Sequence, residues 1–255
     1  MNKLKAALKF FLFILLTVPI VAMQWLLLLV YKGKAAYILP WIWQMGVCAI
    51  FRIKIKIIGT PHNQSQTIYV SNHISYLDIS VIGSILRASF VAKKDVASWP
   101  VFGFLSTLQQ TAFISRDRAD VKQAKNNLDQ MLNDGKSLII FPEGTSTDGK
   151  EVIPFKSSLF SIAMKENLKD IYVQPFTLKM QSVDGKPVET QETRDLYSWH
   201  INMDTPLGEH LWRFAQSSGA VISLNFHEPL KAHDFENRKT LAKACYEAVS
   251  NGLTN

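Results

Sequence analysis

Cysteine, charge and several catalytic motifs are scarce or missing in this chain of 255 residues. Its two cysteines, Cys48 and Cys245, form neither a CxxC pair nor another metal-ligand spacing, so we expect reduced thiols and no disulfide framework. No GxSxG sequence occurs, which excludes the nucleophile turn of an α/β-hydrolase. Lys and Arg form no dense run and no recognition motif is present, so we expect no nucleic-acid partner.

Charged residues make up only 19% of the chain, whereas 47% are hydrophobic, which is rich for a soluble domain. The net charge of +7 indicates an anionic partner. Because nucleic acid is not expected, anionic phospholipid or a phosphate-bearing carrier fits this charge better. A chain of this length buries one sizeable core or two small ones.

The apolar excess lies near the N-terminus. Residues 10–31 carry no charge, and these about 22 residues are long enough to cross a bilayer as a helix. Residues 35–51 are also uncharged, but a helix of this length reaches only about 25 Å. We predict a membrane-embedded helical hairpin over residues 1–51, which either spans the bilayer or lies in one leaflet. Lys32 and Lys34 between the runs favour one leaflet, and the apolar run is too long for a cleaved signal peptide.

From residue 52 onward, strand patterns alternate with helix patterns. Strands are predicted at 52–57, 68–70, 90–92, 111–114, 138–141, 171–180 and 220–226, and helices at 75–86, 99–105, 118–133, 157–165 and 234–249. This alternation predicts an α/β domain over residues 52–255, with a mostly parallel central sheet covered by helices. The continuously apolar strand 138–141 is expected at the centre of the sheet.

A histidine and an aspartate follow the second predicted strand. His73 stands in a strand-to-helix turn, and Asp78 stands in the first turn of the helix, from which it can fold back onto the ring. An aspartate on one ring nitrogen fixes the tautomer and leaves the other nitrogen free as a base. Two other interpretations remain open: Ser75-x-x-Asp78 also fits a capping box, and His73 can be a turn residue bonded to backbone.

Polar residues also follow two later strands, namely Arg116 and the segment Glu143-Gly144-Thr145. The carboxyl ends of parallel strands meet at one edge of a sheet, so we expect these residues to lie near His73. Gly144 lets backbone N–H groups approach a ligand, and Thr145 offers a hydroxyl. Taken alone, however, Pro-Glu-Gly-Thr is an ordinary turn sequence.

Four blocks in this order resemble the glycerolipid acyltransferases, in particular the 1-acyl-sn-glycerol-3-phosphate type. They are Asn72-His73-x4-Asp78, Phe113-Ile114-x-Arg116, Phe141-Pro142-Glu143-Gly144-Thr145 and an apolar strand that contains Pro175. The resemblance covers residues 69–176, and an N-terminal two-helix anchor is also found in that family. It implies that His73 is the base and Asp78 its orienting partner. It further implies substrate-binding roles for Asn72, Arg116, Glu143, Gly144, Thr145, Ser146, Lys156 and Pro175, the last in an acyl pocket.

The resemblance implies a membrane-bound O-acyltransferase with its catalytic domain on the cytoplasmic side, in a bacterial inner membrane. The acyl donor is a thioester, acyl-CoA or acyl carrier protein. The acceptor is the free hydroxyl of a lysophospholipid, for which 1-acyl-sn-glycerol-3-phosphate, giving phosphatidic acid, is the commoner role. Such a transfer needs a base and oxyanion donors, but no covalent enzyme intermediate, metal or cofactor.

Three positions depart from the family pattern. Gln110 replaces the glycine that opens the second block, Ser146 replaces an arginine taken as a phosphate contact, and Ser158 replaces a glycine. This variant resembles the bacterial subgroup that acylates lyso-ornithine lipid, whose acceptor has no phosphate. Lys156 or Arg116 could still serve a phosphate, so a phosphate-free lysolipid stands as the alternative acceptor.

Two functions of other classes remain. A hydrolase or metal enzyme would need a nucleophile or a third nitrogen ligand, and the remaining histidines have no helpful spacing. A non-catalytic lipid-binding membrane protein would consume no thioester in the presence of a lysolipid.

Overall fold

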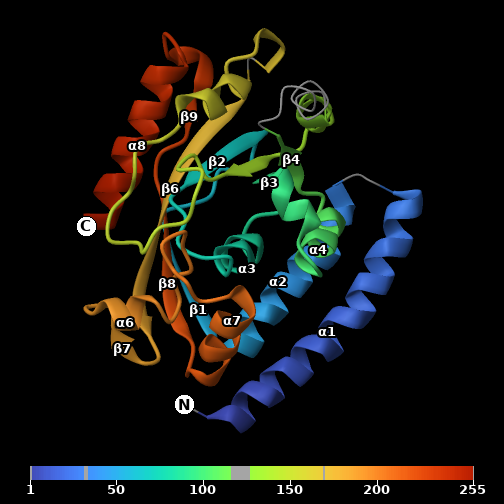
Figure 1. The fold of residues 1–255 in the computed structure, drawn as a ribbon. Helices are drawn as coiled ribbons and strands as arrows, with labels where there is room; N and C mark the ends of the chain where they lie inside the picture. The colour runs from blue at the N-terminus through green and yellow to red at the C-terminus, as the bar shows by residue number, and fades with distance from the viewer. Residues whose placement is uncertain (1, 32–33, 116–126, 169, 255) are drawn as a thin grey trace.

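Two apolar helices precede a sheet that is covered on both faces (Figure 1). This computed structural model describes residues 2–31, 34–115, 127–168 and 170–254. Helix α1 (Lys3–Val30) and helix α2 (Ile38–Phe51) are joined through the 3-10 turn η1 (Lys34–Tyr37). Helix α1 begins before the apolar run because the Asn2 side chain caps it, accepting the Lys5 N–H at 3.2 Å. In the described part of the chain, one helix, α1, is long and apolar enough to cross a membrane.

The sheet has the strand order β1-β8-β6-β2-β5-β3-β4. Its strands are β1 (Ile53–Ile58), β2 (Thr67–Ser71), β3 (Ser89–Lys93), β4 (Ala112–Ile114), β5 (Leu138–Ile140), β6 (Tyr172–Val183) and β8 (Ala220–Phe226), and the short β7 (Lys186–Pro187) and β9 (Leu230–Lys231) pair with β6. All neighbours on this path are parallel except β6 and β8, which are antiparallel. The predicted mostly parallel sheet is therefore confirmed, and β5 lies inside it with all three residues buried.

The helices of the α/β region agree with the prediction in part. They are α3 (Asp78–Gly83), α4 (Phe102–Leu108), α6 (Gln191–Arg194), α7 (Leu207–Gln216) and α8 (Arg238–Thr254), with 3-10 turns η2 (Lys94–Ser98), η3 (Ser157–Ile162), η4 (Glu166–Leu168) and η5 (Ala232–Asp234). Helix α3 is shorter than the predicted 75–86, because residues 75–77 form a turn in which the Asp78 N–H bonds the Ser75 carbonyl at 3.0 Å. The predicted helix 157–165 is a 3-10 turn, and α6 and α7 were not predicted. Of the predicted helix 118–133, residues 127–133 are described and are helical.

Buried apolar residues form one cluster on each face of the sheet. On one face, α2, α3 and α7 cover the strands, and α1 packs outside them (Figure 1). On the other face, η3 and α8 pack over β2, β5 and β6. Ala6 of α1 and Val47 and Phe51 of α2 belong to the first cluster, so the apolar helices share a core with the sheet. A division into two domains at residue 51 stays a prediction.

Candidate active site

The turn after β2 brings His73 and Asp78 together. The ring Nδ1 lies 2.8 Å from Asp78 Oδ2, and the same oxygen accepts the N–H groups of Ile74 at 2.7 Å and Ser75 at 2.9 Å. Asp78 therefore orients the histidine and also ties down the start of α3. The orienting role and the capping-box role, which the sequence left as alternatives, are therefore both filled by the Asp78 carboxylate.

This geometry fixes the histidine tautomer. Asp78 Oδ2 is an acceptor for two backbone N–H groups, so it also accepts from the ring, and His73 Nδ1 carries the proton. The other ring nitrogen, Nε2, is left as the basic one. Asp78 is fully buried, whereas 20% of the His73 side chain is exposed. The pair therefore has the arrangement of a general base with an orienting carboxylate.

Aromatic stacking fixes the plane of the His73 ring. Phe141, which directly follows β5, stacks on it with ring centroids 4.0 Å apart and an interplanar angle of 13°. Phe90 of β3 stacks on Phe141 in turn, at 6.2 Å. Side chains from three neighbouring parallel strands or their ends thus set the orientation of the candidate base.

Glu143 supports the His73 turn from the end of β5. Its Oε2 accepts the His73 backbone N–H at 2.7 Å, and its Oε1 accepts the Ile153 N–H at 2.9 Å. The side chain is 1% exposed, and this burial raises the pKa of its carboxyl group to about 7. These contacts are those of a structural support. A direct substrate contact by Glu143 stays a prediction.

Asn72 has a similar position beneath the turn. Its side-chain N–H donates to the Leu178 carbonyl at 2.9 Å, and its Oδ1 accepts the Leu178 N–H, also at 2.9 Å. The residue is fully buried. Asn72 therefore clamps the end of β2 to β6, and its predicted substrate-binding role is likewise untested.

Gly144 and Lys156 lie directly against each other. Gly144 has a φ of +69°, and a Cβ placed on it would lie 2.2 Å from the Lys156 Nζ. The Lys156 N–H also bonds the Pro142 carbonyl at 2.9 Å, which ties the lysine backbone to the same loop. Glycine at 144 thus allows a lysine ammonium to approach the loop closely. Thr145 and Ser146 follow it and are partly buried.

The remaining predicted residues have different outcomes. Arg116 lies outside the described residues. Pro175 is buried in β6 opposite Val70, at the point where β6 changes partners from β9 to β8, which suits a residue without an N–H. Gln110 has a φ of +60°, a left-handed conformation that glycine adopts more readily, which agrees with the glycine expected there from the family pattern.

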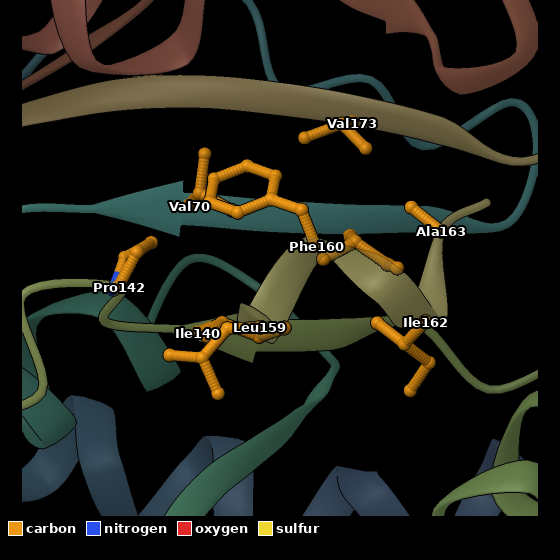
Figure 2. A pocket seen from close by; sticks show the side chains of 9 residues that line it. Val70, Ile140, Pro142, Leu159, Phe160, Ile162, Ala163 and Val173 are labelled. Atoms are coloured by element: carbon orange, nitrogen blue, oxygen red, sulfur yellow. The ribbon is translucent and has the colours of Figure 1, made fainter. Parts of the chain in front are cut away.

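A narrow apolar pocket lies on the α8 side of the sheet, next to Pro142 (Figure 2). Its lining comes from β2, β5, β6 and η3, and Val70, Phe160 and Val173 point toward one another across it. The lining side chains carry no polar group, and they pack so closely that the pocket leaves no room even for a water molecule, so it is part of the apolar core and not an open acyl channel. Pro175 does not line it, and the predicted role of Pro175 in an acyl pocket stays a prediction.

Sequence reasoning missed Tyr197. Its hydroxyl donates to Asp78 Oδ1 at 3.0 Å, and the residue is fully buried. It lies 119 positions after Asp78 in a segment without a recognisable motif, so no local signal pointed to it. Among the residues that the structure describes, no group of three or more His, Cys, Asp or Glu side chains could hold a metal ion. That the reaction needs no cofactor stays a prediction.

Comparison with known proteins agrees with this geometry. The family model described as Acyltransferase matches residues 52–179, half of the chain. Lyso-ornithine lipid O-acyltransferase from Rhodobacter capsulatus is 35% identical over 207 residues, covering 80% of this chain and 72% of that protein. The enzyme of the same name from Brucella abortus is 30% identical over 240 residues, covering 92% and 88%. A 1-acyl-sn-glycerol-3-phosphate acyltransferase from Neisseria meningitidis is 28% identical over 206 residues, covering 80% and 76%.

The fold is also found in a solved structure. The 1-acyl-sn-glycerophosphate (LPA) acyltransferase from Thermotoga maritima superposes with a TM-score of 0.64 over 100% of this chain and 97% of that chain, at 20% sequence identity.

Proposed function

Because the chain belongs to the acyltransferase family, we propose that it moves a fatty acyl group from an acyl thioester to the hydroxyl of lyso-ornithine lipid. The observation that carries the transfer step is the His73–Asp78 contact of 2.8 Å at the sheet edge. The donor is acyl-CoA or an acyl carrier protein, and no cofactor takes part. Among the described residues, no cluster of three or more His, Cys, Asp or Glu side chains supports a metal-dependent alternative.

The proposed reaction has two steps at one base. His73 Nε2 takes the proton of the acceptor hydroxyl as its oxygen attacks the thioester carbonyl, which forms a tetrahedral intermediate. The imidazolium is balanced by the Asp78 carboxylate on its other nitrogen. The C–S bond then breaks, and the leaving thiolate receives the proton from His73. The products are the ester and a free thiol.

Ser146 supports a phosphate-free acceptor. A serine hydroxyl is neutral, whereas an arginine at this position would be an unpaired charge in a partly desolvated site if the acceptor had no phosphate. The relatives named above that are 30% or more identical also carry the lyso-ornithine lipid name. We therefore place lyso-ornithine lipid before 1-acyl-sn-glycerol-3-phosphate, whereas the commoner role in the family had suggested the opposite order.

A second candidate acceptor is 1-acyl-sn-glycerol-3-phosphate. The Lys156 ammonium favours it, because this cation lies beside Gly144, two positions before Ser146, where the family pattern has an arginine. The same ammonium is also suited to the carboxylate of an ornithine headgroup. The chemistry shared by both acceptors is an anionic group near Lys156.

An acceptor panel tests this proposal. The purified full-length protein receives one long-chain acyl-CoA and either lyso-ornithine lipid or 1-acyl-sn-glycerol-3-phosphate, and the diacylated products are quantified by mass spectrometry. We expect the lyso-ornithine product to predominate. Turnover of the phosphate-bearing acceptor alone, abolished by Lys156→Ala, would establish the second candidate instead.

The contacts of α1 favour an anchor in one leaflet. Near its start, the Lys9 ammonium donates to the Ser217 carbonyl at 3.1 Å, and near its end the Gln24 amide donates to the Leu108 carbonyl at 2.9 Å. These two contacts are separated by about 22 Å along the helix, given a rise of 1.5 Å per residue. Both carbonyls belong to the α/β part of the chain, so a helix that crossed the bilayer would pull one of them into it.

The outer face of α1 is apolar and exposed. Leu8, Phe11, Leu15, Val18 and Leu26, spaced three, four or eight residues apart, are each more than half exposed. We propose that this face lies in the cytoplasmic leaflet of a bacterial inner membrane, with the helix parallel to the surface. Acyl chains of acceptor and donor would then reach the sheet edge from the same leaflet.

A further inference from the structure

A buried tyrosine beyond residue 179, where the family match ends, contacts the His73–Asp78 pair. Tyr197 lies between α6 and α7 and donates its hydroxyl proton to Asp78 Oδ1 at 3.0 Å. We propose that Tyr197 is a positioning residue for acyl transfer, which holds the Asp78 carboxylate and through it the His73 ring. This inference rests on the proposed role of His73 as the base.

The two oxygens of Asp78 differ in their partners. Oδ2 accepts three hydrogen bonds, from His73 Nδ1 and from the N–H groups of Ile74 and Ser75. Within the described ranges, the Tyr197 hydroxyl is the donor recorded for Oδ1. The terminal torsion of an aspartate is broad, so three bonds on one oxygen leave the carboxylate plane weakly defined. A donor on Oδ1 defines that plane and also satisfies a buried charged oxygen.

Tyr197 is suited to donate at all relevant pH values. Complete burial and the nearby Asp78 charge both raise the pKa of the Tyr197 phenol well above its usual range. The phenol therefore keeps its proton whenever the enzyme is active. Asp78 already accepts hydrogen bonds from backbone N–H groups, and its Oδ1 accepts a further one from the Tyr197 hydroxyl.

The position of Tyr197 is itself fixed. Its ring packs edge to face on Phe214 of α7, with centroids 5.8 Å apart and planes at 82°. Two residues later, the Trp199 N–H bonds the Ile74 carbonyl at 3.0 Å, which ties the same segment to the turn that carries His73. The segment that supplies the hydroxyl is thus tied to the turn that it supports.

Tyr197→Phe removes the hydroxyl and keeps the ring. We expect kcat to fall about tenfold, within the 10–100-fold range typical when an outer-shell partner of a metal-site ligand is removed. KM for both substrates should stay within twofold, because Tyr197 is fully buried and we therefore expect it to contact neither substrate. Tyr37→Phe is the matched control, because the Tyr37 hydroxyl is also buried and hydrogen-bonded. Its partner is the Ser89 hydroxyl at 2.6 Å, at the amino end of β3 and therefore at the sheet edge opposite the candidate site. The control should keep the parental kcat.

The pH dependence of kcat/KM gives a readout that a purely structural role would not move. Ionisable groups around the pair are Glu143, bonded to the His73 N–H, and Cys48 and Tyr76, which lie near Tyr197. Of these, Glu143 titrates near neutrality and is present in parent and variant alike. Losing the donor leaves more negative charge facing the ring, so the ring keeps its proton to higher pH. The acidic midpoint of kcat/KM should therefore be higher in Tyr197→Phe than in the parent.

A folding-neutral variant covers the case in which Tyr197→Phe is unstable. Site-specific 3-fluorotyrosine at position 197 keeps the ring and the hydroxyl but donates more strongly, so the acidic midpoint should fall. A thermal melt and the membrane-bound fraction report folding for each variant.

Two results would overturn the inference: parental kcat and pH profile in a folded Tyr197→Phe protein, or an unshifted midpoint with 3-fluorotyrosine. The variant His73→Ala separates a failure of the Tyr197 inference from a failure of the proposed function. If His73→Ala stays active, the base assignment fails; if it is inactive while Tyr197→Phe is normal, only the role of Tyr197 fails.

Discussion

Replacing Asp78 by asparagine separates its two structural roles. An asparagine side-chain oxygen can occupy the place of Oδ2 and still accept the N–H groups of Ile74 and Ser75. Its amide nitrogen would then face the Tyr197 hydroxyl, which can accept from it. The cap of α3 therefore survives, and the charge beside His73 disappears.

The magnitude follows from the 2.8 Å separation of Nδ1 and Oδ2. Two unit charges at this distance interact by about 6 kcal/mol at an effective dielectric constant of about 20. With 1.36 kcal/mol per tenfold in rate, a fully formed imidazolium would lose about 10⁴-fold, and one that is half formed in the transition state about 10²-fold. We expect kcat of Asp78→Asn to lie in this range below the parent, with KM nearly unchanged.

The assay follows thiol release from a long-chain acyl-CoA by a chromogenic thiol reagent, with and without the lysolipid acceptor. Thermal unfolding in the same detergent is the control, and the free energy of unfolding should change by at most about 2 kcal/mol. Turnover within threefold of the parent, combined with a clear loss of stability, would show that Asp78 only caps the helix.

Four further outcomes are expected. His73→Ala should lower turnover by 10²–10⁴-fold while the protein stays folded and membrane-bound, as thiol release and flotation will measure; activity within a few-fold of the parent would contradict the base role. Ser146→Arg should lower turnover of lyso-ornithine lipid and open the site to 1-acyl-sn-glycerol-3-phosphate. The phosphate-free proposal would be contradicted if the parent already prefers the phosphate acceptor and the variant merely lowers KM for it. Deletion of residues 1–50 should release the protein from membranes and cause aggregation, because it exposes the apolar residues that pack against Val47 and Cys48 in the core. Size-exclusion chromatography checks this, and a monodisperse, fully active truncation would refute it. Because burial raises the pKa of Glu143 to about 7, the folded state binds a proton more tightly than the unfolded state, and the free energy of unfolding should decline as the pH rises from about 4.5 to 7. Urea titrations at several pH values measure this slope, which should be flatter in Glu143→Gln. An unchanged slope in that variant would exclude Glu143 as its source.

The strands were the easiest part of the fold to predict. Strand 138–141 is continuously apolar and strand 220–226 lies between polar turns, and both are found at or within one residue of the predicted bounds. Helix α7 was missed although it has a strongly amphipathic pattern, because Pro206 and Gly208 at its start read as loop residues. Helix α3 was predicted too long because Ser75 caps a turn before the helix proper begins.

The site could be predicted only where its residues follow a motif. His73 and Asp78 are five positions apart, so local geometry was enough to predict their contact. Tyr197 reaches the same carboxylate from 119 positions away, and that proximity depends on the packing of α6 and α7 against the sheet. Asn72 and Glu143 were predicted as site residues from the motifs, but their bonds to the backbone of Leu178 and His73 depend on which strands are neighbours in the sheet.

The long-range contacts of α1 also constrain the order of folding. Lys9 bonds Ser217, 208 positions later, and β1 pairs with β8, whose first residue is Ala220. At a synthesis rate of about 5–20 residues per second, the N-terminal helix leaves the ribosome about 10–40 s before its partner exists. During that interval α2 can already pack on α1, but the part of α1 that contacts α7 has no protein surface to cover it, and early contact with the membrane would protect it from aggregation. Strand β8 and helix α7 then close the structure, so an unfinished chain should sediment with membranes yet remain sensitive to proteases.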